Sequence, residues 1–120
     1  PLNNPPPSQC CLCGKHIQAT QTSQSVWLRI RNMIIGLSPE SRQRFLIEIE
    51  RYNSSIFNFI HGHTYSSEEV IDDVLPRLRR FYPDGSDGRK CMLCLFNYLF
   101  QRSGLSDLAD QVKRLNPDRR

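Results

Sequence analysis

The stretch CMLCLFNYLF, at residues 91–100, contains one clearly polar residue, Asn97. A helix with apolar side chains on every face is stable only where other protein surrounds it. We therefore predict that this stretch forms the central helix of the fold and that it ends near Gly104. A short chain has few helices with which to surround a central one. A second hypothesis is therefore that another copy, or a helical partner, covers one face.

The rest of the apolar pattern predicts further helices around this stretch. Apolar residues recur at helical spacing in residues 23–37, 37–53, 65–83 and 105–115, and no segment shows the alternation typical of a strand. Residues 54–63 are apolar but short, and form either another helical turn or a buried connector. The chain is thus predicted to be all-α, a small bundle of five or six short helices.

Several residues mark where these helices begin or bend. Ser38 is a natural N-cap, Ser66 and Glu69 have the spacing of a capping box, and Ser106 is expected to cap the last helix. Pro76 should kink or break its helix, because proline removes a backbone hydrogen bond and clashes with the preceding turn.

The bulk composition indicates one small domain with two tails. The chain has 120 residues, of which 38% are hydrophobic, and a net charge of +4. We expect a proline-rich extended leader at 1–9, a single zinc-stabilised helical domain at 10–115 and a C-terminal tail at 116–120. No apolar run approaches the roughly 18 residues that span a bilayer, and no signal-peptide pattern is present, so we expect no contact with a membrane.

The five cysteines carry the clearest chemical signal. An odd number, with no sign of secretion, argues against a disulfide framework and favours an intracellular protein of the cytoplasm or nucleus. Cys10 and Cys13 form one Cys-x-x-Cys pair, followed by Gly14, and Cys91 and Cys94 form another at the start of the central helix. Each spacing lets two thiolates converge on one zinc ion. We predict one structural zinc per chain, which clamps the N-terminal knuckle onto the fifth helix.

Other ligand sets remain open. His16 stands three residues after Cys13, Cys11 is able to replace Cys10, and His61 or His63 offers an imidazole nitrogen. Free buried thiols and a redox disulfide are the remaining alternatives. Four thiolates leave no open position on the metal, and no His-Glu-x-x-His motif or phosphate-binding loop is present. We therefore expect no enzymatic activity and no small-molecule substrate.

A zinc-stabilised domain without a catalytic site is expected to act by binding macromolecules. The first hypothesis is a regulatory or adaptor domain that contacts a protein partner and self-associates through or beside helix 91–100. The second is RNA or DNA binding, because arginines next to aromatic residues suit phosphate contact and base stacking. The arginines that would make these contacts are Arg77, Arg79 and Arg80, together with Arg29 and Arg31.

Overall fold

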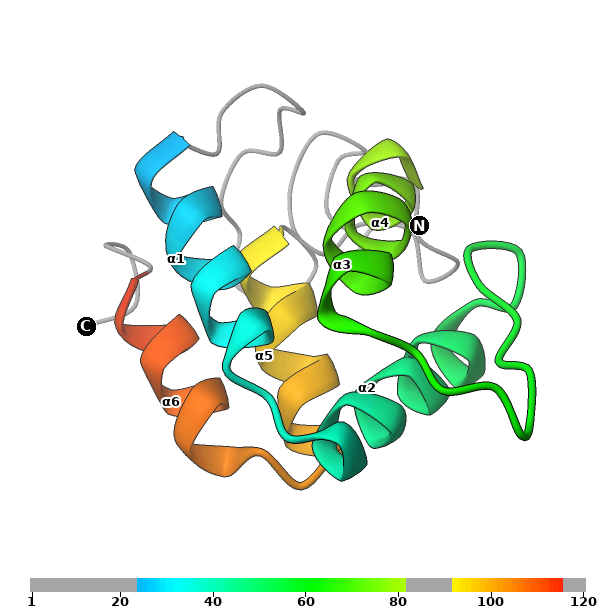
Figure 1. Ribbon diagram of the computed structural model, residues 1–120. Coiled ribbons are helices and arrows are strands. Elements are labelled where there is room, and N and C mark those ends of the chain that lie inside the picture. The colour runs from blue at the N-terminus through cyan, green and yellow to red at the C-terminus, as the bar shows by residue number, and fades with distance from the viewer. Residues whose placement is uncertain (1–23, 82–91, 116–120) are drawn as a thin grey trace, which may run out of the picture.

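Every regular element in the part of the chain that the structure describes is a helix. This computed structural model describes residues 24–81 and 92–115 (Figure 1). The chain forms α1 and α2, then a continuous helical segment made of α3, a π-helical turn and α4, and finally α5 and α6. The all-α prediction is confirmed, with five helical segments, whereas the leader, the zinc knuckle and the tail lie outside the described residues. The bounds are α1 Gln24–Ile35, α2 Pro39–Tyr52, α3 Ser67–Glu69, the π-helical turn Val70–Val74, α4 Leu75–Phe81, α5 Met92–Arg102 and α6 Ser106–Arg114.

Helix α5 lies at the centre of the bundle, as predicted. It is surrounded by the other helices in Figure 1, and seven of its side chains are buried. Phe96 is fully buried and its ring lies 6.1 Å from that of Trp27 in α1 and 6.4 Å from that of Phe45 in α2. The bundle therefore covers most of α5, while Tyr98 is 37% exposed. The buried residues are Met92, Leu93, Cys94, Leu95, Phe96, Leu99 and Phe100.

Helix α2 begins as its sequence predicts. The Ser38 hydroxyl accepts a hydrogen bond from the Ser41 N–H at 3.2 Å, which satisfies one of the unpaired donors of the first turn. Phe45, Leu46 and Ile49 follow at helical spacing and are fully buried. These apolar side chains pack α2 against α5 and form part of the core.

The segment that starts at the Ser66 cap and ends at Phe81 stays helical through Pro76. Ser66 and Glu69 form the predicted capping box, with hydrogen bonds of 3.1 and 3.0 Å. The N–H of Leu75 donates to the carbonyl of Val70, five residues earlier, so one turn is π-helical. Pro76 follows directly, and its ring would crowd the carbonyl four residues before it in a regular helix. The wider turn accommodates the proline, which explains why the predicted kink takes this form.

The connector between α2 and α3 is irregular and mostly exposed, so residues 54–63 form no further helix and reach the core only through a few side chains. Ile56, Phe57 and Tyr65 are buried in it. Arg42 of α2 ties this connector to the rest of the bundle, because its guanidinium donates to the carbonyls of Tyr65 at 2.8 Å and Leu37 at 3.3 Å. The connector therefore contributes to the core although it has no regular structure.

Helices α5 and α6 form a tight hairpin. Gly104 has a φ of 76°, a conformation that favours glycine, and it ends α5 where the sequence predicts. The Asn97 amide donates to the Ala109 carbonyl at 2.7 Å, so the single polar residue of the central stretch joins the two helices. Ser106 is the first residue of α6 and makes no capping hydrogen bond, so its predicted role as N-cap is wrong. None of the described helices is long and apolar enough to cross a bilayer.

Candidate interaction groove

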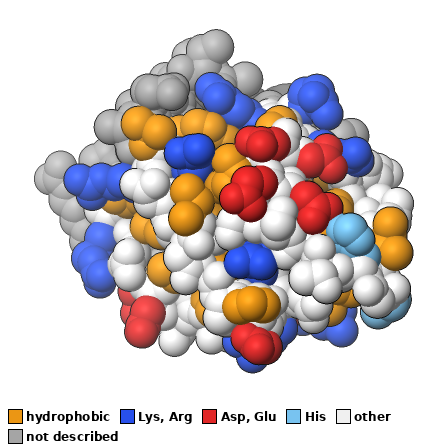
Figure 2. Space-filling view, in the orientation of Figure 1, with side chains coloured by type: hydrophobic (Ala, Val, Ile, Leu, Met, Phe, Trp, Pro, Cys, Tyr) orange, Lys and Arg blue, Asp and Glu red, His pale blue; other side chains and the backbone are white. Residues whose placement is uncertain are grey.

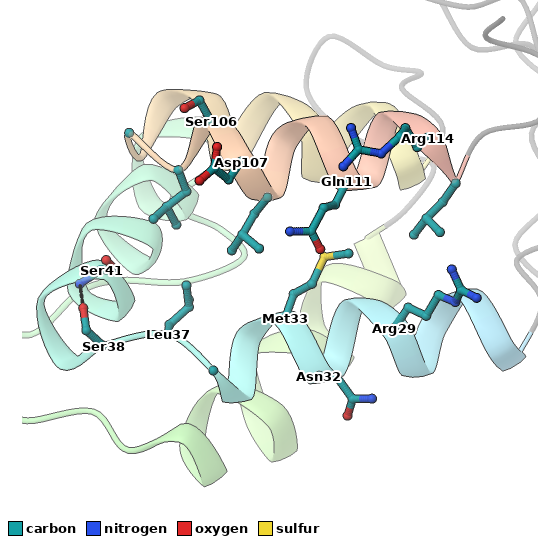
Figure 3. A pocket seen from close by; sticks show the side chains of 15 residues that line it. Arg29, Asn32, Met33, Leu37, Ser38, Ser41, Ser106, Asp107, Gln111 and Arg114 are labelled. Atoms are coloured by element: carbon teal, nitrogen blue, oxygen red, sulfur yellow. Dashed lines mark hydrogen bonds between the residues drawn. The ribbon is translucent and has the colours of Figure 1, made fainter.

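An open groove with a volume of about 960 Å³ lies between α1 and α6. Figure 3 shows that the two helices run in opposite directions along its sides. Leu37, Ser38 and Ser41, from the α1–α2 link and the first turn of α2, lie at one end. The groove is therefore framed by secondary structure on three sides, which gives it a defined shape.

Helix α1 contributes to the groove with one of its faces and to the core with another. Ile30 and Ile34 are fully buried in the core. The groove residues include Arg29 and Met33, each one position before one of these core residues. They recur three or four residues apart, which places them on a common face. These residues are Arg29, Asn32, Met33 and Gly36.

Helix α6 is divided in the same way. Ala109 and Val112 are fully buried, and the helix packs chiefly on α5. The groove residues lie on the neighbouring face, because they are separated by three, four or seven positions. They are Asp107, Leu108, Gln111, Arg114 and Leu115.

The floor of the groove is apolar and incompletely covered. Met33, Leu105, Leu108 and Leu115 are partly buried hydrophobic residues that pack against the core, and Leu37 is buried beside them. Each of these side chains keeps some surface toward the groove, so a ligand that covers it removes apolar area from water. An apolar floor within a polar rim is the usual anatomy of a protein interface.

The charges of the groove are separated along its length. Arg29 and Arg114 lie at one end, Met33 and Gln111 face each other near the middle, and Asp107 lies toward the other end (Figure 3). Among the described residues, neither of these arginines makes a hydrogen bond or an ion pair. The groove therefore has positive charge at one end, from two arginines without a partner among the described residues, and a carboxylate toward the other end.

Apolar surface continues from the groove onto the outer face of α1. Leu28 is 44% exposed and Ile35 is 45% exposed, and their spacing of seven residues places them on one face. Figure 2 shows hydrophobic side chains gathered over α1, with basic side chains among them. The contact surface available to a partner is therefore wider than the groove alone.

The predicted zinc ligands lie mostly outside the described residues. Cys10, Cys13 and Cys91 are outside them, as are the reserve ligands Cys11 and His16. Within residues 24–81 and 92–115, no group of three or more His, Cys, Asp or Glu side chains is arranged to hold a metal ion. The four-cysteine zinc site therefore stays a prediction.

Cys94 is the one predicted zinc ligand that the structure places. It lies in the first turn of α5 and is 3% exposed. The predicted position of the second cysteine pair at a helix N-terminus is therefore confirmed for Cys94. Cys94 is also part of the hydrophobic core, a position that an ordinary buried thiol occupies as well.

The two reserve histidines lie in the connector before α3, each against an aromatic ring. The Nε2 atom of His63 lies 2.8 Å from a carboxylate oxygen of Glu69, and the His63 ring packs on Tyr65. The His61 ring contacts Phe59 edge-on at 5.2 Å. The Ser66 N–H that donates to Glu69, together with His63, holds the pKa of the Glu69 carboxyl below its usual value.

The arginines predicted to contact nucleic acid have different surroundings. The Nε atom of Arg77 lies 2.9 Å from a carboxylate oxygen of Asp73, and the Arg79 guanidinium lies 5.2 Å from the centre of the Trp27 ring. Trp27 belongs to α1, so this cation–π contact joins α4 to α1. Two of the three predicted contacts on α4 are therefore engaged within the fold.

The remaining predicted arginines are exposed but are not gathered into one basic surface. Arg29 lines the groove, whereas Arg31 and Arg80 are exposed elsewhere on α1 and α4. Acidic side chains gather over α3 and the π-helical turn in Figure 2, close to the basic ones. Neighbouring charges of opposite sign weaken contact with phosphate. The described arginines therefore form no single basic surface for nucleic acid, and nucleic-acid binding stays a prediction.

The groove itself was not anticipated from the sequence. The helical spacing of Arg29, Met33 and Gly36 marks a second face on α1, and α6 shows a similar second face at Leu108 and Leu115. Those patterns are present in the sequence, but the approach of α1 to α6 depends on how α6 packs on α5 and how α1 packs on α3 and the π-helical turn. A helical-wheel analysis would have shown the faces without showing that they meet.

Comparisons with known proteins supply no relative for this chain. No family model matches it, and neither the curated proteins nor the solved structures contain a significant match.

Proposed function

We propose that this chain is a regulatory or adaptor domain that binds a segment of another protein in the groove between α1 and α6. The observation that carries the proposal is the incompletely covered apolar floor formed by Met33, Leu105, Leu108 and Leu115. Two uncommitted arginines and several polar side chains surround this floor. A partner that fills the groove gains apolar contact in the middle and polar contact at the rim.

The chemistry of the lining supports binding rather than catalysis. Asp107 is the single carboxylate among the described residues of the groove, and those residues include no histidine and no cysteine. Acid–base catalysis requires titratable groups within reach of each other, and nucleophilic catalysis requires an activated nucleophile. Ser106 precedes Asp107 in the lining, but among the described residues no serine hydroxyl of the groove donates to a carboxylate or an imidazole. We therefore propose a non-catalytic role for this surface.

The position of α5 changes where a contact with another chain is expected. The sequence placed self-association on or beside residues 91–100, because that stretch is apolar on nearly every face. Within the described residues the bundle itself buries seven of those side chains, and Tyr98 is 37% exposed. The partly buried residues Met33, Leu105, Leu108 and Leu115 gather in one groove, whereas the exposed Ile60 and Tyr98 lie outside it, which is why we place the proposed contact on α1 and α6.

Selection of peptide ligands tests the proposal without knowledge of the natural partner. The full chain is immobilised and exposed to a display library of random peptides, and the selected peptides are mapped onto the chain by NMR chemical-shift changes. We expect shifts concentrated at the groove residues of α1 and α6. Peptides that map to a different surface, or a library that yields no ligand, would overturn the proposal.

A matched pair of variants controls the mapping. Gln111→Trp places a bulky ring in the groove from an exposed position, so it should block the selected peptides without disturbing the core. Asp110→Trp places the same ring on an exposed position of α6 outside the groove and should leave binding unchanged. Equal effects of the two variants would count against the groove as the binding surface.

We further propose that one structural zinc ion stabilises this domain, held by Cys10, Cys13, Cys91 and Cys94. The buried position of Cys94 in the first turn of α5 supports this, because a ligand there would connect the leader to the central helix. The zinc would then act on the groove only indirectly, by stabilising the bundle that α1 and α6 pack against.

A further inference from the structure

The proposed function leaves open which kind of protein segment fills the groove, and the geometry narrows this choice. Addition of a strand requires an exposed sheet edge, and residues 24–81 and 92–115 contain no strand. Recognition of a polyproline helix requires an aromatic-lined groove, and the described lining of this groove contains no aromatic residue. A helix that lies in an apolar groove between two other helices is a common mode that this lining does fit.

The dimensions of the groove suit a short helix. The nine residues of α6 span about 13.5 Å, so a docked helix of roughly 9 to 12 residues would cover the groove from end to end. Apolar side chains at i, i+3 or i+4, and i+7 on such a helix fall on one face. That face would meet the apolar floor at Met33, Leu108 and Leu115, as a third helix laid against α1 and α6.

The charges of the groove define the ends of this helix. Arg29 and Arg114 lie together at one end and make no ion pair with another described residue, whereas Asp107 lies toward the other end. Three other arginines on this domain form ion pairs, Arg51 and Arg102 with Glu48 and Arg77 with Asp73, whereas Arg31 and Arg80 are exposed outside the groove. The two groove arginines therefore remain available to carboxylates of a ligand.

The dipole of the ligand helix acts in the same direction. A helix has partial negative charge at its C-terminus and partial positive charge at its N-terminus. The C-terminal end is therefore attracted to Arg29 and Arg114, and the N-terminal end is attracted to Asp107. Carboxylates in the last turn of the ligand would add charge-assisted hydrogen bonds to the arginines.

We propose that the groove binds an amphipathic helix of a partner protein, oriented with an acidic C-terminal turn against Arg29 and Arg114 and its N-terminus toward Asp107. This inference rests on the proposed function and specifies its ligand. The apolar face of the helix supplies most of the contact area, and the terminal carboxylates fix the direction in which it lies.

Two synthetic peptides test the inference directly. Both are about 12 residues long and carry leucines at helical spacing. One has glutamates in its last turn and the other has lysines there. Fluorescence anisotropy with the full chain measures both affinities, and circular dichroism measures the helix gained on binding. We expect the glutamate peptide to bind about tenfold more tightly, since two favourable surface charge pairs replace two unfavourable ones, and we expect this preference to shrink as salt is added.

Charge reversal on the protein provides the matched control. The double variant Arg29→Glu/Arg114→Glu should abolish or invert the preference between the peptides, because the groove end becomes acidic. The double variant Arg31→Glu/Lys113→Glu makes the same change of net charge on the same two helices at exposed positions outside the groove lining, and should keep the preference. Thermal melting of both variants confirms that each is folded.

The possible outcomes separate this inference from the proposed function. Equal affinity for both peptides, a preference that Arg29→Glu/Arg114→Glu leaves unchanged, or a bound peptide without helix would overturn the inference. Peptides from the random library that still map to the groove would leave the proposed function standing. A wild-type dimer by sedimentation that Gln111→Trp dissociates would identify a second copy as the occupant and would also overturn the inference.

Discussion

Helices α5 and α6 follow each other in the chain but use their apolar residues differently. Seven of the eleven residues of α5 are buried, and Phe96 contacts rings of both α1 and α2. In α6 only Ala109 and Val112 are buried, while Leu108 and Leu115 keep surface toward the groove. The more apolar helix thus forms the centre of the core, and the less apolar helix leaves apolar surface toward the groove.

This difference has a general physical reason. A helix that is apolar on every face is satisfied only at the centre of a bundle, where all its faces are covered. An amphipathic helix at the edge of the bundle needs only part of its apolar stripe for the core, and the remainder faces outward. The binding potential of a small bundle is therefore better sought on its edge helices than on its most apolar one.

The largest expected effect concerns zinc binding by the first turn of α5, a role that is not predicted for any residue of α6. We expect wild-type protein to contain about one zinc ion per chain and Cys94→Ser to lose it, because serine is a poor zinc ligand. Structural zinc contributes on the order of 10 kcal/mol in zinc-finger peptides, so metal removal should lower the melting temperature sharply. Elemental analysis and thermal melting with a chelator measure both quantities.

Cys11→Ser is the control for the zinc prediction, since Cys11 is the thiol that the predicted site does not need. It should retain both zinc and stability. Wild-type protein that lacks zinc, or that melts at the same temperature after metal removal, would refute the predicted site. Because Cys94 is buried, its replacement alone also introduces a buried hydroxyl, so the zinc content decides the interpretation.

The next largest effect is on the free energy of unfolding. It compares how much α5 and α6 contribute to stability, by truncating one side chain on each helix. Phe96→Ala should lower the free energy of unfolding by about 3–5 kcal/mol, because a fully buried aromatic ring leaves a cavity. Leu108→Ala should lower it by only about 1 kcal/mol, because Leu108 is partly exposed to the groove. Urea denaturation of both variants measures the difference. Similar losses would mean that α6 is as deeply integrated as α5.

A smaller effect concerns the guanidinium of Arg42, which joins Leu37 at the end of the groove to Tyr65 in the connector between α2 and α3. Arg42→Ala removes hydrogen bonds to the carbonyls of Tyr65 and Leu37 and to the Ser67 hydroxyl, and should lower the free energy of unfolding by about 2–3 kcal/mol. Arg44→Ala removes an exposed arginine that bonds only the Ser41 hydroxyl among the described residues, and should change it by less than about 0.5 kcal/mol. Chemical denaturation compares the two, and a neutral Arg42→Ala would show that this connection does not stabilise the fold.

The smallest expected effect lies in the connector and depends on pH. The pKa of Glu69 is lowered in the folded state by the Ser66 N–H and by His63. A carboxyl with a lowered folded-state pKa adds stability above its unfolded pKa, near 4.5, and this contribution is lost as the pH falls through the folded value. Glu69→Gln should therefore be less stable than wild type at neutral pH, and the gap should close in acid.

Thermal melting between pH 7 and pH 2 measures this gap. Glu68→Gln alters a more exposed carboxylate of the same turn that is not part of the capping box, and should track the wild type across the range. A gap between Glu69→Gln and wild type that persists in acid would attribute the effect to lost hydrogen-bond geometry rather than to charge.

The helices and their caps could be predicted because they depend on neighbours in sequence. Ser38 caps α2, Ser66 and Glu69 form their capping box, and Gly104 ends α5, all as local chemistry requires. Pro76 was expected to disturb its helix, but the π-helical turn that absorbs the proline depends on the packing of Val70 and Val74 in the core. Ser106 was misassigned because Leu105 reaches the capping position in the tight turn after Gly104.

The sequence by itself determined the all-α class, the central position of residues 92–100 and the location of Cys94 near a helix N-terminus. These follow from spacing, composition and local hydrogen bonding, which act over a few residues. Only the tertiary structure decided that α1 and α6 lie side by side, with Arg29 near Arg114 and a groove between them. That arrangement depends on how two edge helices pack on the rest of the bundle, and the packing of side chains far apart in sequence is not encoded in any local pattern.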